Sequence, residues 1–291
     1  TMIRNLFLFL SCTVIIGACS ISEKSEDNHL PLPNELKIGN QVCFNHSLLV
    51  LDSTTYEAVV NSEFISHFAF SQEKQLTGFK GFYLIGKTNY LEIFHPKSIE
   101  GEYWEPGSIW ICLASLKANY LNKLNKEKLD FIEFESDDSY NYMNLRMNDS
   151  SNPIATMEMM KNQFESWTKK EYHDSITFLP VDYNSPQESD SSSNYLMNDV
   201  KGIGLSLNPD DSLKVTRYLK EIGYNSVSEF KGHTRISGNN QFIELHISKD
   251  NNSLSINRFY IQLNQSVEQS TQIIGNTRIE CNGKSAIWIF D

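Results

Sequence analysis

The sequence lacks the short motifs that mark several large enzyme classes. It has no GxSxG, HExxH or CxxC pattern and no phosphate-binding loop. These absences argue against serine hydrolases, zincin-type proteases, thioredoxin-like enzymes and nucleotide hydrolases. Gly202 and Gly204 are spaced like the glycines of a dinucleotide-binding loop, but the rest of that fingerprint is missing. We therefore expect this segment to lead into a strand.

Positive charge is also scarce. The 291 residues include 25 Lys and Arg against 36 Asp and Glu, which gives a net charge of -11. Binding to the phosphates of nucleic acid needs clustered Lys and Arg, and the sequence contains no such run. We expect no nucleic-acid partner.

The five cysteines are too few for a disulfide scaffold. Cys12 and Cys19 lie near the N-terminus, which leaves Cys43, Cys112 and Cys281, an odd number, in the remaining chain. Each lies in or beside an apolar strand pattern. Buried inert thiols are the simplest interpretation, and a catalytic or bridging role is the alternative.

The apolar run from Leu6 to Ile16 is too short to span a bilayer comfortably, and Arg4 precedes it. The sequence then continues Ile-Gly-Ala-Cys and resembles the lipobox of bacterial lipoproteins. The resemblance implies a signal peptide over residues 1–18 and lipidation of Cys19; the alternative is a buried N-terminal strand. Residues 19–38 are polar and are expected to be a flexible tether. Its acidic residues resemble the export signals of surface lipoproteins of Bacteroidetes, although a solvated linker would carry similar charges.

The pattern of the next segment predicts a strand, a short helix and further strands. Its pieces are NHSLLVLD, TTYEAVVNS, FKGFYLIG and NYLEIFHP, over residues 45–96. A similar order follows, with strands at 108–114, 131–135, 140–147 and 154–160 and a helix at 116–129; a strand is also expected at 67–72 and a short helix at 164–172. A third strand at 203–207 leads into a helix capped by Asn208 and closed by Gly223. Four strand candidates come last, at 242–247, 256–263, 277–281 and 286–290.

This order predicts an α+β fold of repeated βαβββ modules that form cupped mixed sheets. We expect paired modules over residues 39–182, a polar linker over 183–197 and a related C-terminal α+β domain over 198–291. Glu92 in YLEIF and Glu158 in IATMEMM occupy the same apolar-Glu-apolar place.

His46 in NHSLLVLD, Glu92 in YLEIF and the element order together resemble a module of the vicinal oxygen chelate superfamily. Two segments, GFYLIGKTNYLEIF and GNTRIECNGKSAIWIF, are similar to a bacterial family with a glyoxalase-like region. The resemblance implies a divalent metal, Zn, Mn or Fe, held by His46, Glu92 and Glu158. The fourth ligand place falls on Ile109, which cannot bind metal.

Each candidate also has a purely structural interpretation. The His46 ring could be satisfied by a backbone carbonyl, and Glu92 and Glu158 could face solvent. Tyr83 and Tyr90 could line a ligand pocket or merely pack it; His95 could assist them or belong to a turn. We expect a lipid-anchored protein of the bacterial cell envelope, at the outer membrane or cell surface, that binds a small ligand in the cup. The alternatives are a metal-dependent lyase, isomerase or dioxygenase, and a scaffold that binds proteins.

Overall fold

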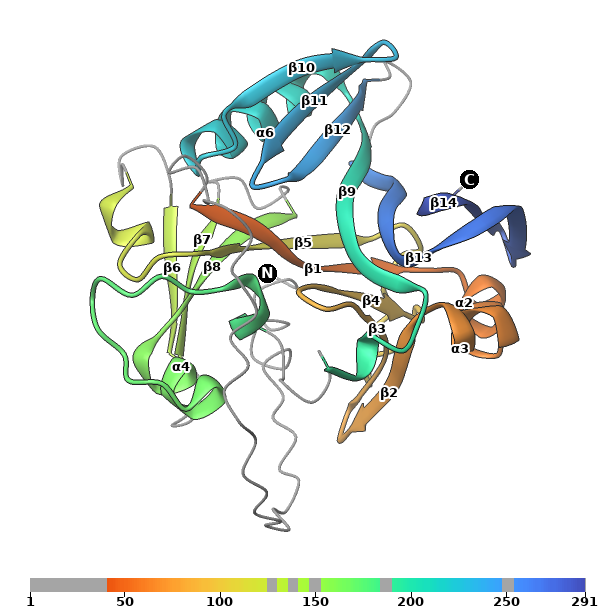
Figure 1. The fold of residues 1–291 in the computed structure, drawn as a ribbon, viewed down its shortest axis with the longest axis horizontal. Helices are drawn as coiled ribbons and strands as arrows, with labels where there is room; N and C mark the ends of the chain where they lie inside the picture. Colours follow the sequence, from red (N-terminus) through yellow and green to blue (C-terminus); the bar gives the residue numbers. More distant parts are fainter. Residues whose placement is uncertain are drawn as a thin grey trace.

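The computed structural model describes residues 41–124, 130–135, 141–146, 153–183, 190–247 and 254–290. Their strands form one eight-stranded and one six-stranded mixed sheet, and the helices are few and short, so the fold is a mixed α+β fold (Figure 1). The expected signal peptide, residues 1–18, and the whole of the expected tether, residues 19–38, lie outside the described residues. None of the helices in the described ranges is long and apolar enough to cross a membrane.

The first module has the predicted βαβββ order, with its strands arranged β2-β3-β4-β1 and β4 parallel to β1. Asp52 caps the first helix by accepting a hydrogen bond from the Thr55 amide at 3.0 Å. Ser62 caps a second helix, so the strand predicted over 67–72 was wrong at its start. The elements are β1 (Val42–Val50), α2 (Ser53–Val60), α3 (Glu63–Phe68), β2 (Phe70–Leu76), β3 (Phe79–Ile85) and β4 (Tyr90–Phe94).

The second module repeats the strand order as β5-β8-β7-β6, and antiparallel pairing of β1 with β5 joins the two modules into one sheet. The helix predicted over 116–129 was wrong in its described part, which holds only a 3-10 turn. Asn119 has a φ of 58°, and this left-handed conformation interrupts a right-handed helix. The elements are β5 (Ile109–Ser115), η1 (Leu121–Lys123), β6 (Asp130–Glu135), β7 (Asn141–Arg146), β8 (Ile154–Met159), α4 (Lys161–Thr168) and η2 (Pro180–Tyr183).

The third module forms most of the second sheet, in the order β10-β11-β12-β9-β13-β14. Asn208 caps its helix as predicted and accepts from the Asp211 amide at 2.8 Å. Strands β10 and β11 were not predicted, and the two candidates at 277–281 and 286–290 are one strand. The elements are β9 (Met197–Leu207), α6 (Pro209–Glu221), β10 (Ser226–Phe230), β11 (His233–Gly238), β12 (Gln241–Ile247), β13 (Ser255–Ile274) and β14 (Thr277–Phe290).

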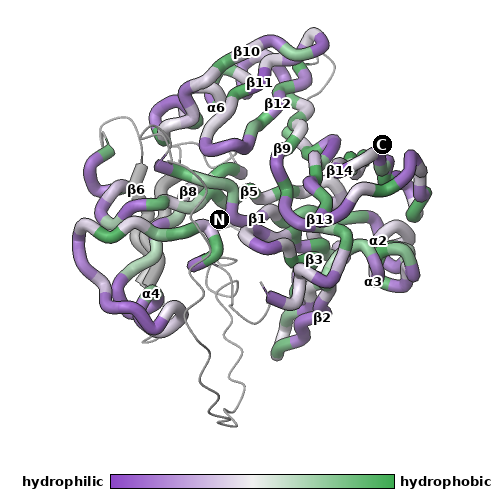
Figure 2. The backbone as a smooth tube through the Cα atoms, in the orientation of Figure 1, coloured by the Kyte–Doolittle hydropathy of each residue, from purple (hydrophilic) through white to green (hydrophobic). Residues whose placement is uncertain are grey.

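One hydrophobic core runs through the first and third modules. Leu49 and Leu91 of the first sheet belong to the same buried cluster as Ile203, Tyr218 and Trp288 of the C-terminal region. Figure 2 shows hydrophobic stretches where β5 and β8 meet and hydrophilic stretches on outer loops such as the one beside α4. The C-terminal region is therefore packed onto the paired modules through a shared core.

Two polar contacts also join the first and third modules. The Asn89 side chain, fully buried in the turn between β3 and β4, donates to the Val200 carbonyl at 3.1 Å and accepts from the Val200 amide at 2.8 Å. Gln241 accepts from the Phe44 amide at 2.6 Å, at the point where a bulge takes β1 out of register with β5. These bonds satisfy backbone groups that the sheet ladders leave open.

Candidate functional site

The eight-stranded sheet has two differently used faces. One face, with Leu49 and Leu91, packs against α2, α3 and the third module. The opposite face, which we call the cup face, carries a second buried cluster that includes Leu48, Tyr83 and Phe94. Because side chains alternate along a strand, this division assigns each candidate to a face.

The structure brings His46 and Glu92 to the cup face. His46 precedes Leu48 by two residues on β1, and Glu92 on β4 pairs with Leu48. The His46 ring stacks on Tyr90, with 4.9 Å between ring centroids, and its Nδ1 lies 2.7 Å from Asn45 Oδ1. An amide oxygen only accepts, so the neutral ring donates from Nδ1 and carries its lone pair on Nε2.

Burial sets the protonation of both groups. It lowers the pKa of His46 to about 3, which keeps the imidazole neutral at physiological pH. It raises the pKa of Glu92 to about 8, against a smaller opposing effect of Lys74. Glu92 is 1% exposed and its Oε2 has no hydrogen-bond partner among the described residues. The carboxyl group is therefore mainly protonated at neutral pH.

Glu158 lies on the opposite face of the sheet. It stands between Met157 and Met159, both of which belong to the cup-face cluster, so its side chain points away from the cup. There it accepts hydrogen bonds from the Asn119 amide at 2.6 Å and the Leu121 amide at 2.9 Å. Glu158 thus holds the turn after β5, and the predicted set of His46, Glu92 and Glu158 is not assembled.

The predicted pocket residues are also divided. Tyr83 and Tyr90 do lie together on the cup face, with 6.2 Å between ring centroids. His95 follows β4 in a turn, where its Nδ1 accepts from the Lys97 amide and its ring meets Tyr56 edge to face. His95 is therefore a turn residue beside α2 and is separate from the two tyrosines.

Aromatic rings pack much of the cup face. Seven aromatic side chains of its cluster are buried. Among the described residues, no group of three or more His, Cys, Asp or Glu side chains is placed to hold a metal ion. The two donors on the cup face, His46 and Glu92, do not complete the three-ligand site that the resemblance implied. The buried rings are Phe79, Tyr83, Phe94, Trp110, Phe164, Phe178 and Tyr183.

The third module differs from the first at the positions equivalent to His46 and Leu48. In the parallel pair β1–β4, Tyr90 faces His46 and Glu92 faces Leu48; in the parallel pair β9–β12, Phe242 faces Gly202 and Glu244 faces Gly204. A Cβ at Gly202 would lie 2.3 Å from the Phe242 ring, and a Cβ at Gly204 would lie 2.6 Å from Arg258 Cγ. These two glycines let neighbouring side chains lie across the middle of the sheet.

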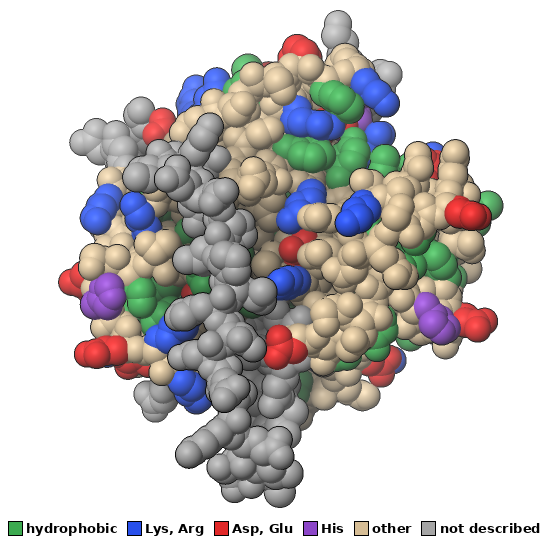
Figure 3. Space-filling model, viewed as in Figure 1, with side chains coloured by type: hydrophobic (Ala, Val, Ile, Leu, Met, Phe, Trp, Pro, Cys, Tyr) green, Lys and Arg blue, Asp and Glu red, His purple; other side chains and the backbone are tan. Residues whose placement is uncertain are grey.

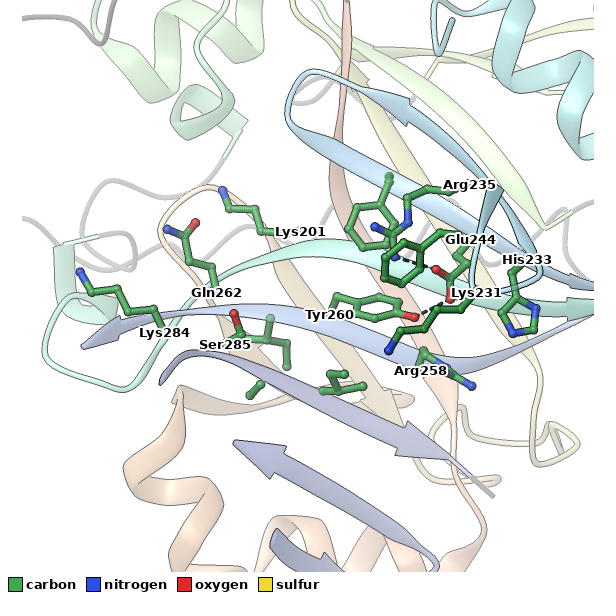
Figure 4. Close-up of a pocket in the computed structure, with 15 residues that line it drawn as sticks. Lys201, Lys231, His233, Arg235, Glu244, Arg258, Tyr260, Gln262, Lys284 and Ser285 are labelled. Atoms are coloured by element: carbon green, nitrogen blue, oxygen red, sulfur yellow. Dashed lines mark hydrogen bonds and ion pairs between the residues drawn. The ribbon is translucent and has the colours of Figure 1, made fainter. Parts of the chain in front are cut away.

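A pocket of about 620 Å³ lies beside Phe242, Glu244 and Arg258 of the six-stranded sheet, and its volume is in the range of small-molecule sites. Figure 3 shows Lys and Arg side chains around a hollow with hydrophobic side chains in it, near the third module and the β13–β14 hairpin. Its polar groups come from five strands and the β10–β11 turn, and its apolar groups include Phe242, Ile261 and Ile287. Figure 4 labels its polar lining: Lys201, Lys231, His233, Arg235, Glu244, Arg258, Tyr260, Gln262, Lys284 and Ser285.

Glu244 organises one side of the pocket. Its carboxylate accepts from Arg235 at 2.7 Å and from the Tyr260 hydroxyl at 2.5 Å, and it lies 2.9 Å from His246 Nε2. Burial alone would raise the pKa of Glu244, but the hydrogen bonds from Tyr260 and Arg235 hold it below its usual value. The group is therefore a carboxylate whose charge is balanced by Arg235.

The Arg235 guanidinium lies between two aromatic rings. Its carbon Cζ is 3.9 Å from the Phe230 ring centroid and 3.8 Å from that of Phe242. Stacking on both faces, together with the bond to Glu244, fixes the orientation of this side chain.

The sequence contained one direct signal for this site. Glu244 stands in FIELHI, the same apolar-Glu-apolar pattern as Glu92 in YLEIF. Arg258, Tyr260 and Gln262 also alternate along one strand, which places them on one face. The pattern cannot show that two of these residues pair with glycines of β9, Arg258 with Gly204 and Tyr260 with Gly202.

Fold and site together define a mixed α+β protein of βαβββ modules with a basic pocket of ligand size. The chain belongs to a family of unknown function, DUF5829, whose model matches residues 44–290. The comparison with curated proteins gives no match.

Three solved structures are similar at 12% identity or less. The crystal structure of a hypothetical protein from Staphylococcus aureus is 12% identical, covers 80% of this chain and 95% of its own, and has a TM-score of 0.48. A xylose isomerase-like TIM barrel/4-hydroxyphenylpyruvate dioxygenase fusion protein is 9% identical, covers 75% of this chain and 36% of its own, with a TM-score of 0.47. A "putative dioxygenase" from Bacillus subtilis is 11% identical, and the match covers 72% of this chain and 62% of the dioxygenase chain, with a TM-score of 0.33.

Proposed function

We propose that this chain is a small-molecule-binding protein of vicinal-oxygen-chelate-like architecture, and that its ligand binds in the pocket of the third module. The observation that carries the proposal is the pocket itself. It has the size of a small-molecule site, an apolar floor that includes Ile261 and Ile287, and polar groups held in place by the Glu244 network. This site replaces the cup of the paired modules as the expected binding site.

The metal-dependent alternative has weaker support. His46 and Glu92 share the cup face, but Glu158 is held by backbone amides on the other face. In the third module, glycines stand at the two β9 positions that correspond to His46 and Leu48. We therefore derive no metal-dependent step from these residues.

Ligand binding is tested with 8-anilinonaphthalene-1-sulfonate, whose fluorescence rises in an apolar pocket, titrated into the purified chain. We expect a saturable signal from one site. Ser285, an exposed residue that lines the pocket, offers a way to fill it: Ser285→Trp should weaken binding by about tenfold, because the indole would occupy ligand space. Asn282→Trp, at an exposed position of the same strand outside the pocket lining, is the control.

Two results would contradict the proposal. The first is the absence of a saturable signal both with this dye and with its neutral analogue N-phenyl-1-naphthylamine, which would favour the scaffold alternative. The second is equal binding by Ser285→Trp and Asn282→Trp, which would place the dye elsewhere on the surface.

We also propose that the chain is anchored to the bacterial cell envelope, at the outer membrane or cell surface, by lipid on Cys19. The apolar run, the small residues and the cysteine that follows them support this proposal. In bacteria grown with radiolabelled palmitate, the parent chain should carry label and fractionate with membranes, whereas Cys19→Ser should do neither. A parent chain without label would refute the anchor.

A further inference from the structure

The pocket of the third module is strongly basic although the chain as a whole is acidic. Five Lys and Arg side chains and one carboxylate line it, a local charge of +4 in a chain of net charge -11. A concentration of one sign of charge in a hollow raises the local concentration of ligands of the opposite sign. The charge therefore favours an anionic ligand.

Most of this charge has no counter-ion. Glu244 is already engaged by Arg235, at 2.7 Å, and Lys201 lies 3.7 Å from Asp199. Within the described parts of the chain, no carboxylate lies within ion-pair distance of Lys231, Arg258 or Lys284. Their charge is therefore not neutralised by an acidic side chain in these parts of the chain, although Arg258 Nε donates to Asn257 Oδ1 at 3.1 Å.

The cations form two groups at opposite ends of the pocket. Figure 4 shows Lys201 and Lys284 at one end, with Gln262, and Lys231 and Arg258 at the other, with Tyr260 between. Arg258 and Gln262 are four residues apart on β13, which corresponds to roughly 13 Å along a strand. Gln262 pairs with Ser285, the neighbour of Lys284, so the second group lies at that distance from the first.

The surface between the two groups is largely apolar. Its half-buried apolar side chains are Tyr260 and Ile287, and the buried residues Ile261 and Ala286 also line it. A hydrophobic segment of a ligand would bury apolar area there, and its ends would lie among the cations.

We infer that the pocket binds an organic dianion, an apolar body with an acidic group at each end. One acidic group is bound by Arg258 and Lys231, and the other by Lys201 and Lys284, while the Glu244 network keeps Arg235 and Tyr260 in place. This inference rests on the proposed function, because it specifies the ligand class of the same pocket.

The test compares suberate with octanoate, which have equally long carbon chains but two acidic groups and one. Each competes with 8-anilinonaphthalene-1-sulfonate for the parent chain. An apolar pocket with only one cationic end would prefer octanoate, because the methyl end of octanoate can be buried in it at no electrostatic cost, whereas the second carboxylate of suberate cannot. With a cationic group at each end we expect suberate to bind about tenfold more tightly, and the preference to shrink as salt is added.

Variants then assign the two ends. Arg258→Gln and Lys284→Gln should each weaken suberate binding by about tenfold, since each removes one charge-assisted contact. Lys220→Gln, an exposed position on α6 outside the pocket, has a matched charge change and should bind suberate like the parent. Thermal melting of each variant shows that it remains folded.

The outcomes separate the two ideas. If octanoate binds as tightly as suberate, or both variants bind suberate like the parent, the dianion is overturned while the pocket still binds small molecules. If the neutral analogue N-phenyl-1-naphthylamine binds and the sulfonate dye does not, the anionic class is overturned on its own. If neither dye binds, the inference and the proposed function fall together.

Discussion

Replacing Glu92 by glutamine should remove a loss of stability that the parent chain undergoes between about pH 4.5 and pH 8. Glu92 is 1% exposed, and burial raises the pKa of its carboxyl group from 4.5 to about 8 in the folded chain. In the unfolded chain the group returns to its ordinary pKa. In this pH range the folded state therefore holds a proton that the unfolded state has released.

The sign follows from proton linkage. Stability falls with rising pH wherever the folded state binds more protons, so the loss begins near the unfolded pKa and is complete above the folded one. The difference between the two pKa values corresponds to about 5 kcal/mol in the free energy of unfolding. Glutamine has a similar shape and no charge, so Glu92→Gln should match the parent near pH 5 and exceed its stability by about that amount near pH 8.

The measurement is urea unfolding of both proteins at a series of pH values. The difference between the two curves isolates Glu92, because every other titrating group is common to both. Glu100→Gln, at an exposed position of the same module, serves as the control and should follow the parent at every pH. A pH-independent difference between Glu92→Gln and the parent would show that Glu92 is ionised in the folded chain at neutral pH.

Asn89→Ala should lower the free energy of unfolding by about 3 kcal/mol. The Asn89 side chain is fully buried and bonds both the amide and the carbonyl of Val200. Alanine would leave these two buried backbone groups without partners, and each unpaired group carries a desolvation penalty. The effect should be large because Asn89 and Val200 are both fully buried.

Asn61→Ala provides the comparison for this variant. Asn61 also donates from its side-chain amide to a backbone carbonyl, that of Glu57 at 2.8 Å, but at an exposed position. Water replaces that bond, so we expect a change below about 1 kcal/mol. Denaturant unfolding at pH 7 measures both variants, and equal destabilisation by the two would mean that the Asn89 bonds do not hold the first and third modules together.

The element order was accessible from sequence because it depends on local patterns. Alternating apolar residues predicted most strands, and Asn208 followed by Pro209 located the start of α6. The failures have local physical reasons. Asn119 takes a left-handed conformation where the apolar pattern predicted a helix. All five residues of β10 are exposed, so its sequence shows no alternation of buried and exposed residues from which a strand could be predicted.

The candidate site was predicted only in part. His46 and Glu92 share a face as the resemblance implied, but Glu158 does not, because its strand places Met157 and Met159 in the cup-face cluster. A shift of one residue along a strand moves a side chain to the other face, and the letters around a glutamate do not reveal that shift. Glu244, which carries the same letter pattern, is the glutamate that lines a pocket.

By itself, the sequence determined the number and order of the strands that local patterning specifies, together with the absence of a basic run and of several enzyme motifs. Only the tertiary structure decided where charge and space come together: five cations from separate segments line one pocket. The reason is that periodicity acts between residues close in the chain, whereas a pocket is made by strands that pair across long separations.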